Sequence, residues 1–303
     1  MGDAFSAHGS AQPPGPSSGI AGSHRTWSRR KFLGVSAVAL GAAVLYPTEV
    51  SRHELTIEKR EIYLQRLPDA FRGMRIAQIS DVHFEEFDEA WFVRRVVDQV
   101  NALKPDMVLL TGDFVSDGPW PIRYGAERAN PCADVLSKLN CPRRYASLGN
   151  HDAAVGDAIV TDALESHGIP VLFNRAVPLE QNGQRIWLAG TGSACAGECD
   201  AEKAIPKSAI RDRETILLMA HEPDVLPEMA RYGVDMMFSG HTHGGQIRFP
   251  FLPAMCLPPY GKKYVEGWFR LGPTQLYVNR GLGAVLIPAR LNCPPEITLF
   301  TLV

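Results

Sequence analysis

The stretch MRIAQISDVH, residues 74–83, is a run of apolar residues that ends in an aspartate and a histidine. Its first seven residues have the β-rich pattern of a strand that is buried on both faces. Four further runs, 107–111, 145–148, 216–220 and 236–239, have the same pattern, and each leads directly into polar residues. The five polar segments are Asp81-Val82-His83, Gly112-Asp113, Gly149-Asn150-His151-Asp152, His221 and Gly240-His241-Thr242-His243.

Helix-like stretches separate the first strand-like runs along the chain, at residues 88–103, 133–139 and 154–167. The alternation of buried strands and helices predicts βαβ units, and therefore an α/β fold, for a catalytic domain that spans residues 51–303. In open α/β sheets, ligands bind beyond the carboxyl ends of the strands. We therefore expect all five polar segments to meet at one edge.

The polar segments supply carboxylates, imidazoles and one carboxamide, which is the ligand mix of a site for two metal ions. Residues two apart in an extended chain point to the same side, so Asp81 and His83 can bind one ion. His241 and His243 bind either one ion together or two different ions. Oxygen and imidazole ligands without thiolate favour manganese, iron or zinc over calcium. Manganese is our first expectation.

The ordered pattern D-x-H, G-D, G-N-H-D, H and G-H-x-H resembles that of the calcineurin-like metallophosphoesterases, and the resemblance covers roughly residues 55–303. It implies a four-layer α-β-β-α sandwich of two mixed sheets, with a dinuclear metal site at the carboxyl ends of the strands. It also implies that His151 protonates the leaving oxygen or stabilises the transition state, and that Asp152 orients His151. The first metal would take Asp81, His83, Asp113 and His243. The second metal would take Asp113, Asn150, His221 and His241.

This resemblance predicts a hydrolase that acts on phosphoester or pyrophosphate bonds. Two cations about 3.5–4 Å apart neutralise an anionic phosphoester and activate a water molecule. The closing segments, which run from Gly244 to Gln246, from Asn279 to Gly283 and from Asn292 to Pro295, resemble one bacterial branch of the family. That branch is exported or membrane-associated, and some members cleave the pyrophosphate of UDP-2,3-diacylglucosamine. We therefore expect an anionic, lipid-linked or nucleotide-sugar substrate of the cell envelope.

Two other functions are compatible with the same motifs. The first is a general phosphodiesterase or nuclease. The formal net charge of −2 disfavours it, because the chain has no run of Lys and Arg beyond its amino-terminal region. We accordingly expect no nucleic-acid partner. The second is a non-catalytic metal-binding protein of the envelope, which purified metal-loaded protein without esterase activity would reveal.

The amino-terminal region predicts export. Residues 1–27 are rich in Gly, Ser, Pro and Ala and are predicted to be a disordered leader. Residues 28–50 pair Arg29 with Arg30 ahead of an apolar run, which resembles a twin-arginine signal. The run from Phe32 to Tyr46 is shorter than the roughly 20 residues of a membrane helix, so it is a signal core or a weak anchor. We expect the twin-arginine machinery to deliver the protein to the periplasm or envelope, where it can contact the membrane surface.

Several expectations concern single residues and loops. Residues 116–131 and 193–207 are predicted to be inserts, and Asp224 is predicted to be a helix N-cap. The apolar loop 249–260 is expected to pack on the sheet, with an acyl-binding or bilayer-contacting lip as the alternative. Arg280 is a candidate for binding phosphate oxygens of the substrate. For the cysteines, the alternatives are a Cys195–Cys199 bridge, a Cys132–Cys141 bridge or free thiols.

Overall fold

The computed structural model describes residues 28–87, 89–118 and 122–303, so the predicted leader 1–27 lies outside the described residues. The chain divides after Ala42 into two units, and each is described by itself. The first unit contains most of helix α1 (Arg29–Leu45), which has no buried residue. Helical turns continue beyond α1, and the whole stretch Arg29–His53 is long and apolar enough to cross a membrane. The helical stretch is therefore longer than the apolar run from Phe32 to Tyr46 on which the sequence prediction was based. A signal sequence can have the same length and composition.

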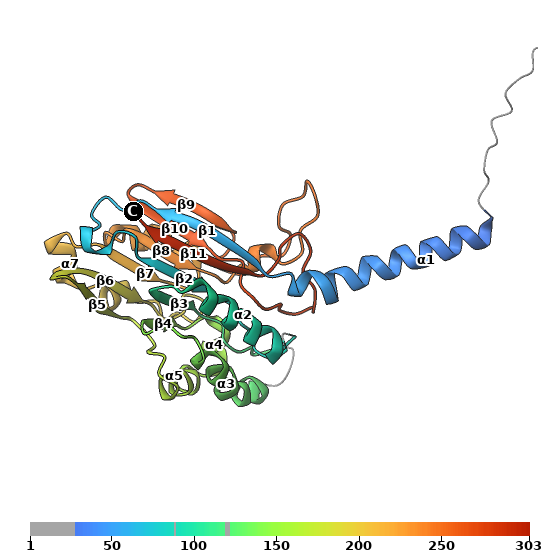
Figure 1. Ribbon diagram of the computed structural model, residues 1–303, viewed down its shortest axis with the longest axis horizontal. Coiled ribbons are helices and arrows are strands. Elements are labelled where there is room, and N and C mark those ends of the chain that lie inside the picture. The colour runs from blue at the N-terminus through green and yellow to red at the C-terminus, as the bar shows by residue number, and fades with distance from the viewer. Residues whose placement is uncertain (1–27, 88, 119–121) are drawn as a thin grey trace, which may run out of the picture. The chain divides into compact units, whose positions relative to one another are not determined.

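The second unit contains two mixed β-sheets, as Figure 1 shows. The first sheet has the strand order β1-β11-β2-β3-β4, in which only the β11–β2 pair is antiparallel. Its strands are β1 (Thr56–Ile62), β2 (Arg75–Ile79), β3 (Met107–Thr111), β4 (Arg144–Ser147) and β11 (Glu296–Leu302).

The second sheet has the order β5-β6-β7-β8-β10-β9, in which the outer pairs β5–β6 and β9–β10 are antiparallel. The pairs β6–β7, β7–β8 and β8–β10 are parallel. Its strands are β5 (Arg175–Gln181), β6 (Gln184–Gly190), β7 (Ile216–Met219), β8 (Met236–Ser239), β9 (Gly267–Leu271) and β10 (Thr274–Val278).

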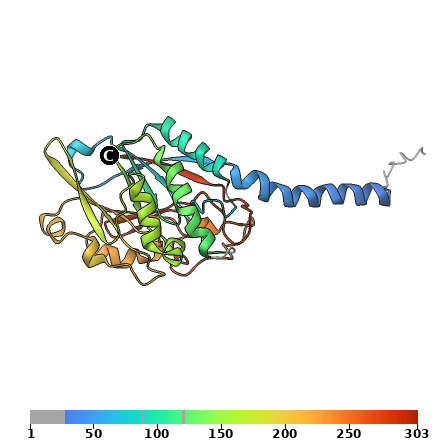
Figure 2. The ribbon, with the colours of Figure 1, turned by 90° about the horizontal axis from the view of Figure 1, so that it is seen from below.

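Three hydrophobic cores separate four layers. Along β3, Met107 and Leu109 contribute to the core between the sheets, whereas Val108 and Leu110 contribute to the core beneath the helices. This strand is therefore buried on both faces, as its apolar run predicts. Figures 1 and 2 show α2–α5 gathered on the β2–β3–β4 side. The helices of this layer are α2 (Ala90–Leu103), α3 (Ile122–Ser137), α4 (Asn150–Val155) and α5 (Asp157–Ser166).

The outer face of the second sheet packs against α6 (Ala201–Ala204), α7 (Lys207–Asp212) and α8 (Leu226–Arg231). The predicted α-β-β-α sandwich of two mixed sheets is confirmed. The side chain of Gln78 crosses between the sheets, because its Nε2 donates to Thr111 Oγ1 and to the Ser239 carbonyl, each at 3.0 Å. Gln78 lies three residues before Asp81, and Ser239 lies two residues before His241, so this link is close to the predicted metal ligands.

Two helix boundaries differ from the sequence prediction. Helix α3 begins at Ile122 and continues through Pro131, so it covers most of the predicted insert 116–131. Burial of Cys132, Ala133 and Leu136 in the core favours the continuous helix despite the proline. The predicted helix 154–167 begins earlier, at Asn150, and is divided at Gly156, whose φ is 130°.

Candidate metal centre

The predicted ligands lie at the carboxyl ends of five strands, at one edge of the two sheets. Asp81 and His83 follow β2, Asp113 follows β3, and Asn150 follows β4. His221 follows β7, while His241 and His243 follow β8. A hydrogen bond joins the two sheets here, because the His241 N–H donates to Asp81 Oδ1 at 2.9 Å.

The ligands form two groups, and the carboxylate of Asp113 reaches toward both. In the first ligand group, ligand atoms of Asp81, His83 and His243 lie within 4.8 Å of one another. In the second ligand group, ligand atoms of Asp113, His221 and His241 do the same. Asp113 Oδ2 lies 2.9 Å from His221 Nε2 and 3.7 Å from His83 Nε2, so this carboxylate reaches toward both groups.

The backbone at the site is locally strained. Positive φ angles occur at Asp81 (51°), His83 (45°), Asp113 (55°), His241 (73°) and His243 (50°). Residues other than glycine rarely adopt this region, and such residues cluster at functional sites. The chain also packs too closely here for a side chain at position 240, because a Cβ on Gly240 would collide with Ser80 Oγ and Asp81 Oδ2.

Carbonyl and hydroxyl groups behind the imidazoles orient them. His221 Nδ1 lies 2.7 Å from the Thr111 carbonyl, so it carries the proton and leaves Nε2 to face Asp113. His241 has the opposite arrangement, since its Nε2 lies 2.7 Å from the Pro259 carbonyl and leaves Nδ1 for the second ligand group. A hydrogen bond on one ring nitrogen fixes which nitrogen can bind a metal.

His83 is oriented by a serine that the sequence analysis missed. Its Nδ1 lies 2.7 Å from Ser116 Oγ, which in turn donates to Glu86. The position of Ser116, three residues after Asp113 in the same loop, was the available signal. The Glu86–Ser116 pair leaves His83 Nε2 facing the site, where it lies 3.2 Å from His243 Nε2.

In the first ligand group, the protonation states of the two imidazoles suit metal binding. Burial lowers the pKa values of both His83 and His243 well below the usual value, so both rings are neutral and offer lone pairs. Burial raises the pKa of Asp113, but His221 and His151 outweigh it and hold that pKa well below its usual value. Asn150 Oδ1 is buried and has no hydrogen-bond partner among the residues that the structure describes. A buried oxygen without a hydrogen-bond partner, at the end of a strand that leads to the ligand groups, fits a site for cations.

The Asp152 carboxylate makes its hydrogen bonds to the backbone, and the structure records no hydrogen bond or ion pair between it and the His151 imidazole. Its Oδ2 accepts from the N–H groups of Asp113 at 2.8 Å and Gly149 at 3.0 Å. Its Oδ1 accepts from the N–H groups of Phe114 at 2.8 Å and Val115 at 3.3 Å. Asp152 thus joins the loop after β3 to the loop after β4.

The carboxylate that pairs with His151 is Asp117, which the sequence analysis did not single out. Asp117 Oδ1 forms an ion pair with His151 Nδ1. Burial lowers the pKa of His151, but Asp113 and Asp117 outweigh burial and raise that pKa to about 9. The ring also stands edge-on to His83, with 4.8 Å between centroids. The His151 side chain is 23% exposed, so it lies at the rim of the cluster.

Arg280, a candidate for binding phosphate oxygens of the substrate, contacts neighbouring parts of the chain. Its Nε lies 3.0 Å from Glu296 Oε2, and one terminal nitrogen donates to Thr56 Oγ1 at 2.9 Å. These contacts join the end of β10 to β1 and β11. The sequence analysis overlooked Arg290, which is fully buried and lies 3.3 Å from His243 Nδ1.

The loop that follows β6 approaches the second ligand group. Buried Glu222 accepts from Ser193 Oγ and from the N–H groups of Ala194 and Cys195. This places Cys195 Sγ 3.9 Å from His241 Nε2. All six cysteines lie in the described part of the chain and carry free thiols, so neither bridge forms.

Asp224 is not a helix N-cap, because α8 begins at Leu226 and the residue before it is Val225. The Asp224 carboxylate instead accepts from the N–H groups of Lys262, Lys263 and Tyr264 at 3.0–3.2 Å.

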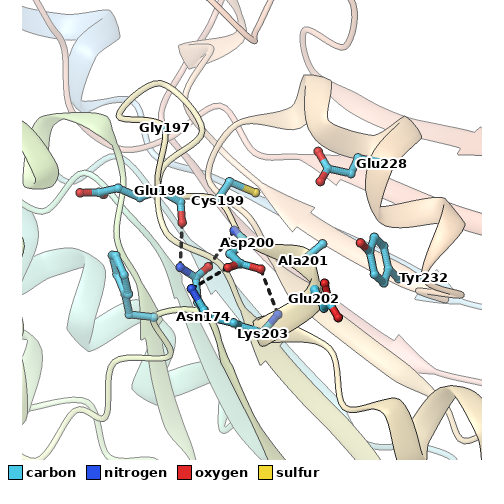
Figure 3. A pocket seen from close by; sticks show the side chains of 11 residues that line it. Asn174, Gly197, Glu198, Cys199, Asp200, Ala201, Glu202, Lys203, Glu228 and Tyr232 are labelled. Carbon is cyan, nitrogen blue, oxygen red and sulfur yellow. Dashed lines mark hydrogen bonds and ion pairs between the residues drawn. The ribbon is translucent and has the colours of Figure 1, made fainter.

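A polar pocket of about 560 Å³ adjoins the loop that follows β6, and Figure 3 shows its lining. Asn174 organises one wall, since its side chain donates to the Glu198 carbonyl at 2.7 Å and accepts from the Asp200 N–H at 3.1 Å. None of the predicted metal ligands lines the pocket. Its carboxylates, on Glu198, Asp200, Glu202 and Glu228, would repel an anionic phosphoester.

Comparison with known proteins finds the calcineurin-like phosphoesterase family over residues 74–245. The metallophosphoesterase YkuE of Bacillus subtilis is 35% identical, over 91% of this chain and 97% of its own. The phosphodiesterase YaeI of Escherichia coli is 33% identical, over 91% of this chain and 99% of its own. The UDP-2,3-diacylglucosamine pyrophosphatase LpxG of Chlamydia muridarum is 28% identical, over 77% of this chain and 86% of its own.

Proposed function

Since this chain belongs to the calcineurin-like phosphoesterase family, it is a phosphoester hydrolase, and we propose that two divalent cations serve its reaction. We further propose that it cleaves a phosphodiester or pyrophosphate bond in a lipid-linked or nucleotide-sugar substrate such as UDP-2,3-diacylglucosamine. The observation that carries the metal proposal is the position of Asp113 between two groups of pre-oriented imidazoles.

Each cation would have its own ligands and share one carboxylate. The first would be held by Asp81, His83, Asp113 and His243, and the second by Asp113, Asn150, His221 and His241. When bound, such cations neutralise phosphoryl charge and lower the pKa of a water molecule. Manganese remains our preferred ion, because hard oxygen and imidazole donors suit it and no thiolate belongs to either ligand group.

His151 is the proposed acid for the leaving oxygen. Its imidazole lies at the rim of the ligand groups, where a substrate can reach it, and a ligand atom of His151 lies within 4.8 Å of those of His83 and Asp113. Asp117 pairs with Nδ1, so Nε2 is the nitrogen available to hand a proton to the departing group. Asp152 takes no direct part in this proton transfer. It holds in place the backbone that carries both Asp113 and His151.

Two observations support the envelope substrate. By their names, one relative is a UDP-2,3-diacylglucosamine pyrophosphatase and another is a phosphodiesterase, so both carry out reactions of the proposed type. The apolar helical stretch Arg29–His53 has the properties of a signal or an anchor. We propose that the paired Arg29 and Arg30 direct the protein through the twin-arginine pathway to the cell envelope.

A substrate panel tests this proposal. Manganese-loaded protein is offered an aryl phosphodiester, UDP-2,3-diacylglucosamine, phosphatidyl lipids and single-stranded DNA. We expect turnover of the aryl ester, and of the nucleotide-sugar pyrophosphate with the highest kcat/KM among the natural compounds. Faster cleavage of DNA, with the pyrophosphate untouched, would overturn the substrate proposal. Absence of turnover on every compound would favour the non-catalytic alternative.

A further inference from the structure

Two loops next to the metal centre carry exposed apolar side chains. In the first, Phe251 is fully exposed, and Phe249, Leu252 and Met255 are also exposed. The expectation that loop 249–260 packs on the sheet is therefore wrong for these side chains. In the second loop, Leu286 is 79% exposed, and its neighbour Ile287 is exposed as well. We call residues 249–257 and 285–288 together the apolar loops.

Hydrogen bonds hold the apolar loops together as one surface. Gln246 Nε2 donates to the carbonyls of Val285 at 3.0 Å and Ile287 at 3.2 Å, and Gln246 Oε1 accepts from the Val285 N–H at 2.9 Å. The Arg248 N–H donates to the Leu291 carbonyl at 2.9 Å. These bonds tie the start of the first apolar loop to the second, so the exposed apolar groups of both belong to neighbouring segments, and exposed apolar surface of this kind marks an interaction site.

The same network includes the end of the amino-terminal helical stretch. The Arg290 N–H donates to the Pro47 carbonyl at 3.0 Å. Around Pro47, the side chains of Leu45, Tyr46 and Val50 are exposed, and all of them belong to the second structural unit. The stretch Arg29–His53, which includes Pro47 in its last part, is long and apolar enough to cross a membrane, so an embedded helix would leave the lipid close to this hydrogen bond.

We propose that the apolar loops dock on the surface of a phospholipid bilayer. A bilayer is the occupant that fits, because the helical stretch would bring the lipid surface to the hydrogen-bond network that holds both loops. The sequence between Arg248 and Lys262 contains no charged residue, so it can enter the interface without burying charge. Lys262 and Lys263 are exposed directly after it, where they can meet anionic headgroups.

Docking would bring the metal centre to the level of the lipid headgroups. Two residues after the first apolar loop, the carbonyl of Pro259 lies 2.7 Å from His241 Nε2. The second begins beyond Gly283, whose carbonyl lies 3.1 Å from His243 Nδ1. The idea that the enzyme takes its substrate from a membrane rests on the proposed function, whereas docking itself does not.

Depth-dependent fluorescence tests the docking. The full chain is reconstituted in vesicles of phosphatidylcholine and phosphatidylglycerol with brominated acyl chains, as a Phe251→Trp variant. The matched control is Ile210→Trp, because Ile210 is an exposed apolar residue (39%) on α7, outside the apolar loops. We expect the emission added by Phe251→Trp to shift to the blue and to be quenched by bromine, and that added by Ile210→Trp to be unaffected.

Equal behaviour of the two variants would overturn the proposal. A blue shift of Phe251→Trp that depends on protein concentration and resists bromine quenching would also overturn it, because a second copy of the chain would then cover the loops. Hydrolysis of a soluble aryl phosphodiester by both variants is measured in parallel. Absence of hydrolysis by the wild type as well as by both variants, alongside retained quenching, would refute the proposed function and leave the docking intact.

Discussion

Asparagine substitutions should distinguish the roles of Asp152 and Asp117, the two aspartates discussed as partners of His151. Asp152 accepts hydrogen bonds from four buried backbone N–H groups, and an asparagine amide can replace only one of its two acceptor oxygens. Asp152→Asn therefore leaves two donors facing an NH₂ group. At about 1.5 kcal/mol for each lost bond, a value between those of neutral and charged hydrogen bonds, the free energy of unfolding falls by about 3 kcal/mol. For a domain of this size, the melting temperature should fall by about 6–12 °C.

Asp117→Asn should give the opposite result. The Asp117 side chain is 40% exposed and pairs with the His151 imidazole, so its loss should change the free energy of unfolding by only about 0.5 kcal/mol. Without the carboxylate, the imidazole is less well oriented and less readily protonated. We expect cleavage of esters with poor leaving groups to slow by about tenfold or more, and activated aryl esters to be affected far less.

Two measurements on each variant decide between these roles. Chemical denaturation gives the free energy of unfolding, and kcat/KM across aryl phosphodiesters of graded leaving-group pKa gives the slope that reports acid catalysis. The reasoning is refuted if Asp152→Asn unfolds like the wild type and steepens that slope, because Asp152 would then be the partner of His151. An unchanged slope for Asp117→Asn would count equally against it.

Three further substitutions test the metal ligands, their support and the export signal. Asn150→Ala should bind one manganese per chain where the wild type binds two, as measured by elemental analysis, with exposed Asn140→Ala unchanged as the control; full occupancy of both sites would remove Asn150 as a ligand. Ser116→Ala should weaken metal affinity by about 10–100-fold, because the His83 imidazole loses its hydrogen-bond partner. Competition with a chelator measures this affinity, and an unchanged value would contradict the role of Ser116. Replacing Arg29 and Arg30 by lysines should leave the protein in the cytoplasm on fractionation; unchanged export would contradict the twin-arginine interpretation.

The sequence predicts the metal ligands well because their placement depends on local patterns. Each apolar run is short enough to be a strand and is followed immediately by its polar residues. Once parallel pairing aligns the carboxyl ends of strands such as β2, β3 and β4, the residues that follow must lie at one edge. The pattern is decided within each segment of about ten residues, so no long-range contact has to be known.

The groups behind the ligands depend on contacts that no local pattern specifies. Asp152 lies next to His151 in the chain, yet helix α4 begins at Asn150 and its first turn directs the Asp152 carboxylate to the backbone of a neighbouring loop. Asp117 lies 34 positions before His151 and meets it only when the loop after β3 has folded. Proximity in sequence therefore suggested the wrong partner.

Some features of the fold also depend on long-range contacts that the sequence pattern does not specify. The sheet contains β11, the last strand, between β1 and β2, and this order follows from long-range pairing of Thr298 with Gln78 and with Glu58. Pro131 suggested the end of an insert, whereas burial of the helix around it overrides the local signal. For loop 249–260 the sequence left an exposed lip only as the alternative, because apolar composition alone favours burial.

Anomalous scattering from crystals soaked in manganese would locate the bound ions. We expect two peaks per chain, one within the first ligand group and one within the second, with the carboxylate of Asp113 in contact with both. The orphaned oxygen of Asn150 should belong to the shell of the second peak. A single peak, or two peaks that do not share Asp113, would contradict the two-metal site on which the proposed hydrolysis depends.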